Sequence, residues 1–452
     1  MPKKKMEKPQ HEMTKRQLSH WQKENRLQRI VILGGIVLIV AILAVIGTGL
    51  YLNKYKPLNA TVIKVGDTEY NMNYFINTLS DYGIQNVNSS YASYYASYLV
   101  QTIEQNQILV EEATKLDPPI TVSDDEIDQY LTDNELSNTT TRRDEVRAQL
   151  MMEKLKSDYF GSTTEPTTEA WKADWVPLTA EQKSVWAMLL ESQSQVDTVK
   201  ARLNSGENFS DIAAELSLDS TSKDNKGDFG WVPKGILTNQ LGDTSGTLLE
   251  NAIFGSDSTA SPIVENELTA VQDTDVSKSI GYWLLEVTEN DTSNNQVHLL
   301  AMLLSSQEQA EQIKAKLEAG GEGNDWATLA KANSIYENAA TDGGDLGFVA
   351  KGTIDDVVDA IIFPEDATQA LPLNQISGAI ADTTQTTTGG YWLVQVNGTD
   401  NNMTISDANR TTLVSTKLNS WFEEKWTAQK DNMQNLLTND QITYAIEQAQ
   451  KR

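Results

Sequence analysis

The stretch Thr341-Asp-Gly-Gly-Asp-Leu-Gly-Phe-Val-Ala-Lys-Gly352 is the most informative part of this chain, because it occurs twice. The other copy lies earlier, as Lys226-Gly-Asp-Phe-Gly-Trp-Val-Pro-Lys-Gly235. Each copy joins a glycine turn to an aromatic residue and a Lys-Gly pair, and such a turn requires positive φ angles or close backbone approach. A lone Gly-Gly-Asp would indicate only a hairpin turn, but here the flanking segments repeat as well.

The glycine block stands within a longer repeat whose parts follow in the same order in both copies. Each copy contains an amphipathic helix that ends at a glycine, Gly206 or Gly320, as helices often do. The other matched segments are Trp186–Leu190 with Leu300–Leu304, Phe209–Ala214 with Trp326–Lys331, Ser217 with Ser334, Ala252–Phe254 with Ile361–Phe363, and Gly281–Val287 with Gly390–Val396. Two such copies predict two domains of one fold, at residues 183–290 and 296–398, because solenoid repeats are shorter.

Composition excludes several classes of function. The chain of 452 residues has no cysteine and a net charge of −27, and residues 1–29 hold nine Lys/Arg against three Asp/Glu. The rest of the chain therefore carries −33, which argues against nucleic-acid binding. Only His298 lies outside the basic tail, so histidine triads and His-rich metal sites are nearly excluded, and we expect neither a metal nor a cofactor.

Residues 30–52 are apolar and carry no charge, which is long enough to span a bilayer. A cleaved signal peptide and a buried core helix are the alternatives, but the apolar run and the basic segment before it are long for a signal peptide. The positive-inside rule places the tail, residues 1–29, in the cytoplasm. The sequence thus predicts a single-pass protein of the cell membrane whose bulk is extracytoplasmic.

Between this segment and the repeats, helical patterns dominate. Residues 58–160 open with a strand pattern and a Gly66-Asp67 turn and continue as helices, and residues 161–182 have the composition of a linker. After the repeats, residues 403–452 are again helical, with an apolar face on the helix at 403–435. An apolar face needs a cover, so we expect this helix to complete the N-terminal domain, with the repeats inserted between.

The repeats resemble parvulin-type (PpiC/rotamase) prolyl isomerase domains, and Asp342-Gly-Gly-Asp-Leu-Gly-Phe348 is the most specific part of that likeness. Over residues 30–430 the chain is similar to membrane-anchored or secreted extracytoplasmic foldases of the SurA, PrsA and PpiD kind. The resemblance implies an α+β fold, with a helical chaperone-like N-domain and with each repeat folded as a four-stranded antiparallel sheet flanked by helices.

The chain departs from this family at its polar site residues. Parvulins usually carry one histidine in the first strand and another in the Gly-Tyr-His strand. The first position holds Met188 and Met302, and the second holds Trp283 and Trp392. His298 lies four residues before Met302, so its side chain need not face the site.

The family's Asp or Cys, two residues after the conserved serine, is Asp219 in the first repeat and Tyr336 in the second. Asp219 is therefore the candidate catalytic residue. Prolyl isomerisation breaks no covalent bond but crosses a barrier of roughly 20 kcal/mol, so it needs an apolar cradle and a well-aimed hydrogen bond. The substrate-binding candidates are Met188, Leu249, Phe254 and Trp283 in the first repeat and Met302, Val358, Phe363 and Trp392 in the second.

Two interpretations of these residues stay open. The methionines and tryptophans can equally be core residues, and Asp219 a solvated loop residue. The tryptophans can fill the proline pocket or form an aromatic platform for unfolded chains.

Three functions are compatible with these residues. The first is a membrane-anchored extracytoplasmic foldase with peptidyl-prolyl isomerase activity, which binds unfolded or newly exported polypeptides with X-Pro bonds. The second is a holdase chaperone whose parvulin-like domains are inactive. The third is an envelope scaffold or binding protein.

Overall fold

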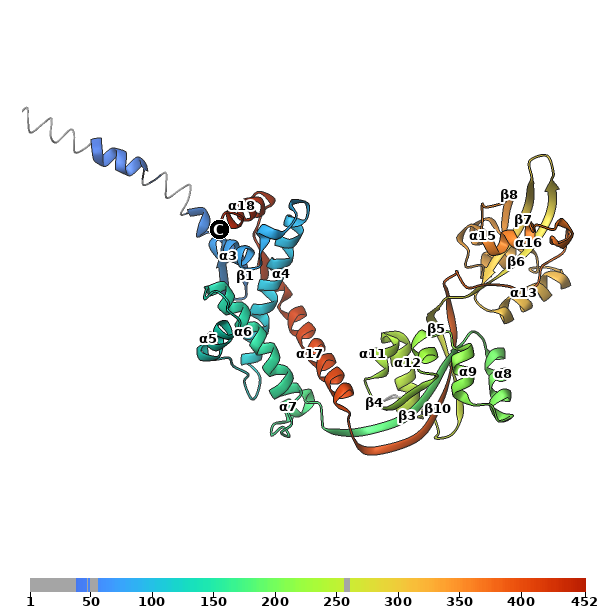
Figure 1. Ribbon diagram of the computed structural model, residues 1–452, viewed down its shortest axis with the longest axis horizontal. Coiled ribbons are helices and arrows are strands. Elements are labelled where there is room, and N and C mark those ends of the chain that lie inside the picture. Colours follow the sequence, from blue (N-terminus) through green and yellow to red (C-terminus); the bar gives the residue numbers. More distant parts are fainter. Residues whose placement is uncertain (1–37, 47, 49–55, 256–260) are drawn as a thin grey trace, which may run out of the picture. The chain divides into compact units, whose positions relative to one another are not determined.

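The computed structural model describes residues 38–46, 48, 56–255 and 261–452. These residues form two compact units of helices and antiparallel sheets, which confirms the α+β class (Figure 1). One unit joins the N-terminal part, up to Tyr159, with Pro166–Asp174 and Leu418–Arg452. The other contains Phe160–Glu165 and Trp175–Lys417.

The first unit packs a small sheet of order β11-β1-β2 against helices. Its elements are β1 (Thr61–Val65), β2 (Thr68–Asn71), α3 (Met72–Asp81), α4 (Ser89–Thr114), α5 (Asp124–Asp133), α6 (Thr140–Lys154), α7 (Glu169–Asp174), β11 (Met433–Asn435) and α18 (Asn439–Ala449). The Asn71 side chain begins α3 by accepting a hydrogen bond from the Tyr74 amide. A capping box between Ser123 and Glu126 begins α5.

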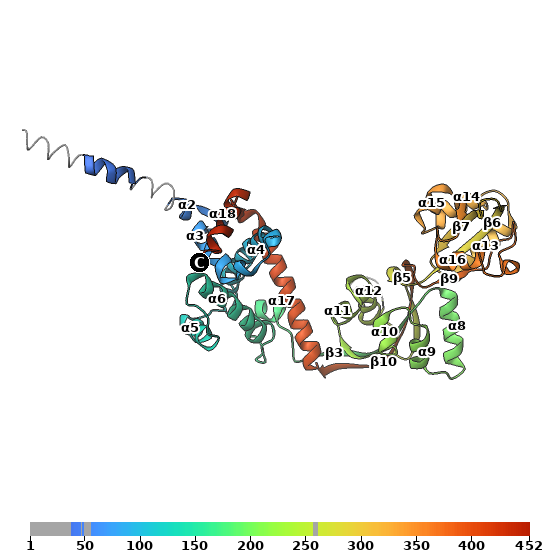
Figure 2. The same ribbon diagram turned by 45° about the horizontal axis from the view of Figure 1, so that its top comes forward.

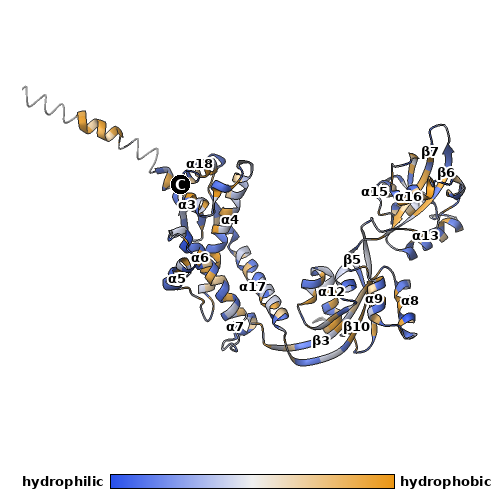
Figure 3. Ribbon diagram, viewed as in Figure 1, coloured by the Kyte–Doolittle hydropathy of each residue, from blue (hydrophilic) through white to orange (hydrophobic). Residues whose placement is uncertain are grey.

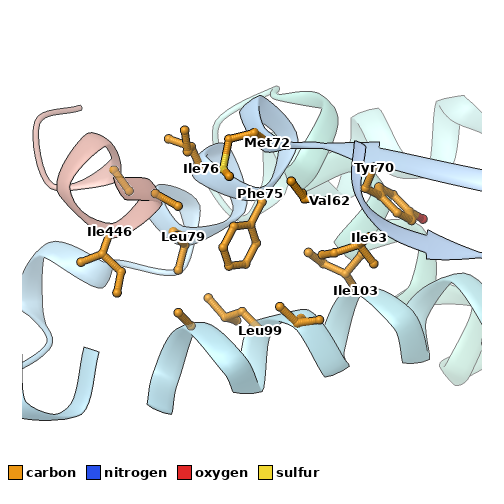
Figure 4. Packing of buried hydrophobic residues seen from close by; sticks show 14 of the residues in the cluster. Val62, Ile63, Tyr70, Met72, Phe75, Ile76, Leu79, Leu99, Ile103 and Ile446 are labelled. Atoms are coloured by element: carbon orange, nitrogen blue, oxygen red, sulfur yellow. The ribbon is translucent and has the colours of Figure 1, made fainter. Parts of the chain in front are cut away.

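The core of this unit is built from residues of the segment before the repeats and of the segment after them. Phe75 of α3 packs with Leu99 of α4 and with Ile446 of α18, and all three are buried (Figure 4). Phe422 and Trp426 of α17 (Asp407–Gln429) pack against the same cluster. The apolar face of the helix after the repeats is therefore covered by the N-terminal part. α18 lies within residues 403–452, for which the sequence predicts a helical segment, whereas β11 was not predicted from the sequence.

The predicted membrane span, residues 30–52, lies mostly outside the described residues, and the basic tail, residues 1–29, lies wholly outside them. Residues 38–46 are helical. Over the part of the chain that the structure describes, no helix is both long enough and apolar enough to cross a membrane.

The second unit contains two four-stranded antiparallel sheets, of order β4-β3-β10-β5 and β8-β7-β6-β9. The strands are β3 (Thr179–Leu190), β4 (Asp228–Pro233), β5 (Leu268–Lys278), β6 (Gly281–Asp291), β7 (Gln296–Leu304), β8 (Asp345–Ala350), β9 (Ile380–Asp382) and β10 (Thr387–Thr404). The helices are α8 (Gln193–Asn204), α9 (Phe209–Leu216), α10 (Ser220–Asp224), α11 (Leu237–Leu241), α12 (Asp243–Phe254), α13 (Gln307–Ala319), α14 (Trp326–Asn333), α15 (Glu337–Asp342) and α16 (Asp356–Ile362).

Helices cover both faces of each sheet. In the first sheet, α11 and α12 lie on one face and α8 and α9 on the other (Figure 2). Apolar residues run along β6 and β7 of the second sheet, where their side chains enter the cores on both faces (Figure 3). Strands buried on both faces read as continuous apolar runs, which is why Leu299–Leu304 shows no alternation.

The sheets do not follow the repeat boundaries, contrary to the expectation that each repeat forms its own sheet. The closing strand of the first repeat, β6, pairs with β7 and β9 of the second repeat. The closing strand of the second repeat, β10, pairs with β3 and β5 of the first. The repeats therefore exchange closing strands, whose apolar patterns match.

Candidate functional site

Two of the first-repeat candidates share one face of the first sheet with a residue of the other repeat. Leu249 and Trp392 are buried in one cluster, and the half-buried Phe254 packs against it. Met188 lies in a different cluster, on the face that α8 and α9 cover. The structure thus separates Met188 from the other candidates of its sheet.

The second sheet has the same arrangement. Trp283 and Val358 are buried together, and Phe363 packs against them. Met302 is buried on the opposite face, beside α13 and α14. The strand exchange therefore places each tryptophan with the candidates of the other repeat.

The residue that stands beside each tryptophan is a leucine that was not among the predicted site residues. Leu189 lies directly opposite Trp392 across the strand pair, and Leu303 lies opposite Trp283. Partners in antiparallel strands point to the same face, so the first-strand position of the site is Leu189 or Leu303. If the residue paired with each tryptophan had been known, the alternation of side chains along the first strand would have identified the leucine. The sequence alone does not give that pairing.

The indole N–H of each tryptophan donates a hydrogen bond to a buried aspartate, and we call this Trp–Asp pair a lock. In the first sheet, Trp392 Nε1 donates to Asp273 Oδ2 at 3.2 Å, and Ser245 Oγ donates to the same oxygen at 2.7 Å. The Asp275 and Val276 amides donate to Asp273 Oδ1 at 3.1 and 3.0 Å. All donors converge on a carboxylate that is almost completely buried.

The second sheet repeats this lock. Trp283 Nε1 donates to Asp382 Oδ2 at 3.0 Å, and the Thr384 amide donates to Oδ1 at 2.9 Å. Burial opposes ionisation of Asp382, but hydrogen bonds from Thr384, Trp283 and Gln385 outweigh it and hold its pKa below the ordinary value. Both tryptophans are only 1% exposed, so they fill the space beside the site and do not form an open aromatic platform.

Asp219 is half-buried and begins a helix. Its Oδ1 accepts a hydrogen bond from the Ser222 amide at 2.6 Å and so caps α10. Burial raises the pKa of Asp219, and hydrogen bonds from Ser222 and the Thr221 amide oppose that rise only in part. Two residues earlier, the buried Ser217 hydroxyl accepts from the Leu189 amide at 3.1 Å and fixes this loop to the edge of β3.

The second domain keeps the serine but not the carboxylate. The Ser334 hydroxyl accepts from the Leu303 amide at 3.2 Å, which matches Ser217 in the first domain. Tyr336 occupies the place of Asp219 and sets its ring edge against Trp283, with 5.2 Å between ring centroids. An aromatic contact thus replaces the acid.

His298 does not face this site. Its Nε2 lies 3.3 Å from Asp345 Oδ1, and its Nδ1 shares a hydrogen bond with the Thr288 hydroxyl at 2.9 Å. Its ring packs edge-on against Phe348. Among the described residues, no group of three or more His, Cys, Asp or Glu is placed to hold a metal ion.

The glycine blocks shape turns. Gly227 and Gly343 have φ angles of +81° and +71°, and a Cβ on Gly343 would stand 2.9 Å from Ala327 Cα. Each following Lys-Gly turn is held by a buried acid that was not predicted from the sequence. Glu250 Oε1 accepts from the Gly235 amide at 3.0 Å, and Asp359 Oδ2 accepts from the Gly352 amide at 2.5 Å.

A cavity of about 430 Å³ opens at the other end of β3. Phe254 is the candidate residue that lines it, beside Trp175 and Pro177 of the segment before β3 and Leu413 of α17. Its other lining residues are Val176, Ala180, Glu181, Pro233, Lys234, Gly255, Ile405 and Lys417. The volume and the mainly apolar lining are those of a small ligand site.

Two segments of the chain match models of known domains. Residues 160–267 match one model of the PPIC-type PPIASE domain, and residues 300–397 match another of the same description. The chain therefore carries two parvulin-type domains, as its resemblance to that family predicted, and these domains are of the peptidyl-prolyl isomerase type.

Two proteins to which the chain is similar are foldases. Foldase protein PrsA of Caldanaerobacter subterraneus subsp. tengcongensis is 25% identical over 223 residues, which cover 48% of this chain and 72% of that protein. Foldase protein PrsA of Clostridium tetani is 38% identical over 56 residues, which cover 12% of this chain and 16% of that protein. The crystal structure of peptidylprolyl isomerase PrsA from Bacillus anthracis aligns with 78% of this chain and 96% of its own, at 12% identity and a TM-score of 0.27.

Proposed function

We propose that this protein is a membrane-anchored extracytoplasmic foldase that binds unfolded exported polypeptides and accelerates isomerisation of their X-Pro bonds. The observation that carries the proposal is the pair of parvulin-type domains, each with an apolar site face between its sheet and a helix. The similarity to PrsA foldases supports the same class of function.

Activity is expected in the first domain, because Asp219 lies two residues after the fixed serine there, whereas Tyr336 takes that place in the second domain. The test is proline-limited refolding of a model protein by the full chain in lipid nanodiscs. Asp219→Asn keeps the helix cap but removes the charge, and we expect it to lose the acceleration together with Asp219→Ala. Asp325→Asn, at the cap of α14 in the second domain, is the matched control and should retain the rate. No acceleration by the unaltered chain would refute the isomerase activity.

A holdase without isomerase activity is the second candidate, favoured by the two tryptophans that fill the site faces. A holdase would suppress aggregation of an unfolded client without changing the proline-limited rate. The cavity beside Phe254 supports binding of apolar segments in either case. If the chain binds no unfolded polypeptide, both candidates fail.

The membrane anchor is proposed from residues 30–52. Within that segment, residues 38–46 are helical and expose Leu38, Leu43 and Val45 by more than 60% each, as a lipid-facing helix would. Since the chain has no cysteine, single cysteines introduced at Ser19 and at Ser293 can be labelled in intact cells with an impermeant maleimide. We expect labelling at position 293 only, and labelling at position 19 would contradict the orientation.

A further inference from the structure

The two closing strands occupy equivalent places in the two sheets. In each sheet the closing strand places its tyrosine beside the third-strand position, Tyr391 opposite Gln272 and Tyr282 opposite Ala381. A register shift falls at the same point of each strand, after Val287 in β6 and after Val396 in β10. Because β6 and β10 share even this register shift, either strand fits the closing position of either sheet.

The Trp–Asp locks are equally interchangeable. Asp273 precedes Trp283, and Asp382 precedes Trp392, by the same number of residues. Each tryptophan nevertheless bonds to the aspartate of the other repeat. With closing strands in their own repeats, the same two locks would form within each repeat, so lock chemistry does not decide the pairing.

The turn between β6 and β7 does favour one pairing. Asp291 Oδ1 accepts from the Ser293 amide at 2.9 Å and from the Asn294 amide at 3.2 Å. Asn295 has a φ angle of +54°, which asparagine tolerates better than most residues. By contrast, β5 runs on to Lys278 and pairs there with Thr387, so β6 could pair with its own sheet in the place of β10 only if residues 274–280 left that strand and formed the turn.

We propose that the turn at residues 291–295 selects the exchanged pairing. The turn pairs β6 with β7. The position between β3 and β5 then stays unpaired, and β10 pairs with both of these strands. Without this turn, each sheet closes with the strand of its own repeat. This inference does not depend on the proposed function.

Cysteine pairs in the full chain test the proposal, because the chain has no cysteine of its own. Opposite residues of antiparallel strands have Cα atoms about 4.5–5.5 Å apart, which suits a disulfide. The exchanged pairing predicts cross-links for Gln272→Cys with Tyr391→Cys and for Ala381→Cys with Tyr282→Cys. Pairing within repeats predicts cross-links for Gln272→Cys with Tyr282→Cys and for Ala381→Cys with Tyr391→Cys. Each substitution occurs once in either set, so the effect of each substitution on folding is matched.

We expect cross-links of the exchanged set only when the turn is intact. Replacing Asp291 by Ala and inserting a flexible Gly/Ser segment after Ser293 should move cross-linking to the within-repeat set. Exchanged cross-links that persist in this variant would overturn the role of the turn. Within-repeat cross-links with the intact turn, or disulfide-linked dimers, would overturn the exchange itself.

Discussion

At the residue scale, the tryptophans that replace the family histidines are the decisive change in both domains. A histidine at these positions could take part in a polar site, whereas Trp283 and Trp392 each commit their one N–H to a buried aspartate. The remaining polar group of the first domain is Asp219, and its carboxylate already caps a helix. The site faces are therefore apolar and filled, and any isomerase activity depends on what Asp219 can do beyond capping.

The first lock can be measured by a double-mutant cycle. Trp392→Phe leaves Asp273 with one donor fewer in a buried place, so we expect a loss of roughly 1–3 kcal/mol in the free energy of unfolding. Asp273→Asn should cost less in the Trp392→Phe background than in the unaltered chain, and chemical denaturation measures both. Trp231→Phe is the control, because Trp231 is 40% exposed. Purely additive losses would show that the pair is not coupled.

The second lock predicts a pH dependence. The pKa of Asp382 is lowered in the folded state, so the carboxylate adds stability above its unfolded pKa of about 3.9, and this is lost as the pH falls through the folded pKa. Asp382→Asn should therefore flatten the loss of stability below about pH 4.

The pKa of Asp219 is raised instead, so the carboxyl adds stability at low pH that is lost as the pH rises through the folded pKa. Asp219→Asn should change the slope of the free energy of unfolding against pH in the direction opposite to Asp382→Asn. Unfolding curves from pH 3 to 6 distinguish the two, and equal slopes for both variants would contradict the assignment.

At the element scale, the repeated glycine blocks are turns held in place by buried acids. The glycines supply positive φ angles and room, and Glu250 and Asp359 accept the amides of the Lys-Gly turns. The blocks therefore shape these turns of the fold.

Removing the acid should loosen the turn. Glu250 accepts from the amides of Gly235 and Leu237, so Glu250→Ala leaves buried donors without their partner. We expect a loss of roughly 1–3 kcal/mol in the free energy of unfolding of the second unit. Glu265→Ala, an exposed acid of the same domain, should change it by less than about 0.5 kcal/mol. Equal effects at the two positions would refute the role of Glu250.

At the scale of the whole molecule, early parts of the chain are completed by segments that come much later in the sequence. The first unit closes only when the segment after the repeats returns, since α18 and α17 supply part of its core. Within the second unit, the first sheet closes only with β10, which follows the whole second repeat. Both closures join residues far apart in sequence, and such contacts slow folding.

The first closure predicts a large effect from a single residue near the end of the chain. Ile446 is buried against α3 and α4, so Ile446→Ala should destabilise the first unit by about 2–4 kcal/mol. Glu447→Ala, on the exposed side of the same helix, is the matched control. Hydrogen exchange at the α3 amides reports the change, and equal protection in both variants would contradict it.

The elements that depend on local pattern could be predicted from the sequence. Repeated segments predicted two domains of one fold, and an apolar helix face after the repeats predicted a return of the chain. These features follow from spacing and side-chain chemistry within a few residues of each other.

Which strand closes which sheet, and what the tryptophans do, emerged only from the folded chain. The closing strands β6 and β10 have the same pattern, so no local feature of either strand distinguishes its partners, which lie on segments distant in the sequence. The same pairing placed Leu189 and Leu303, not Met188 and Met302, beside the tryptophans. Side-chain direction in a strand alternates with every residue, so the faces could be known only once the partners were.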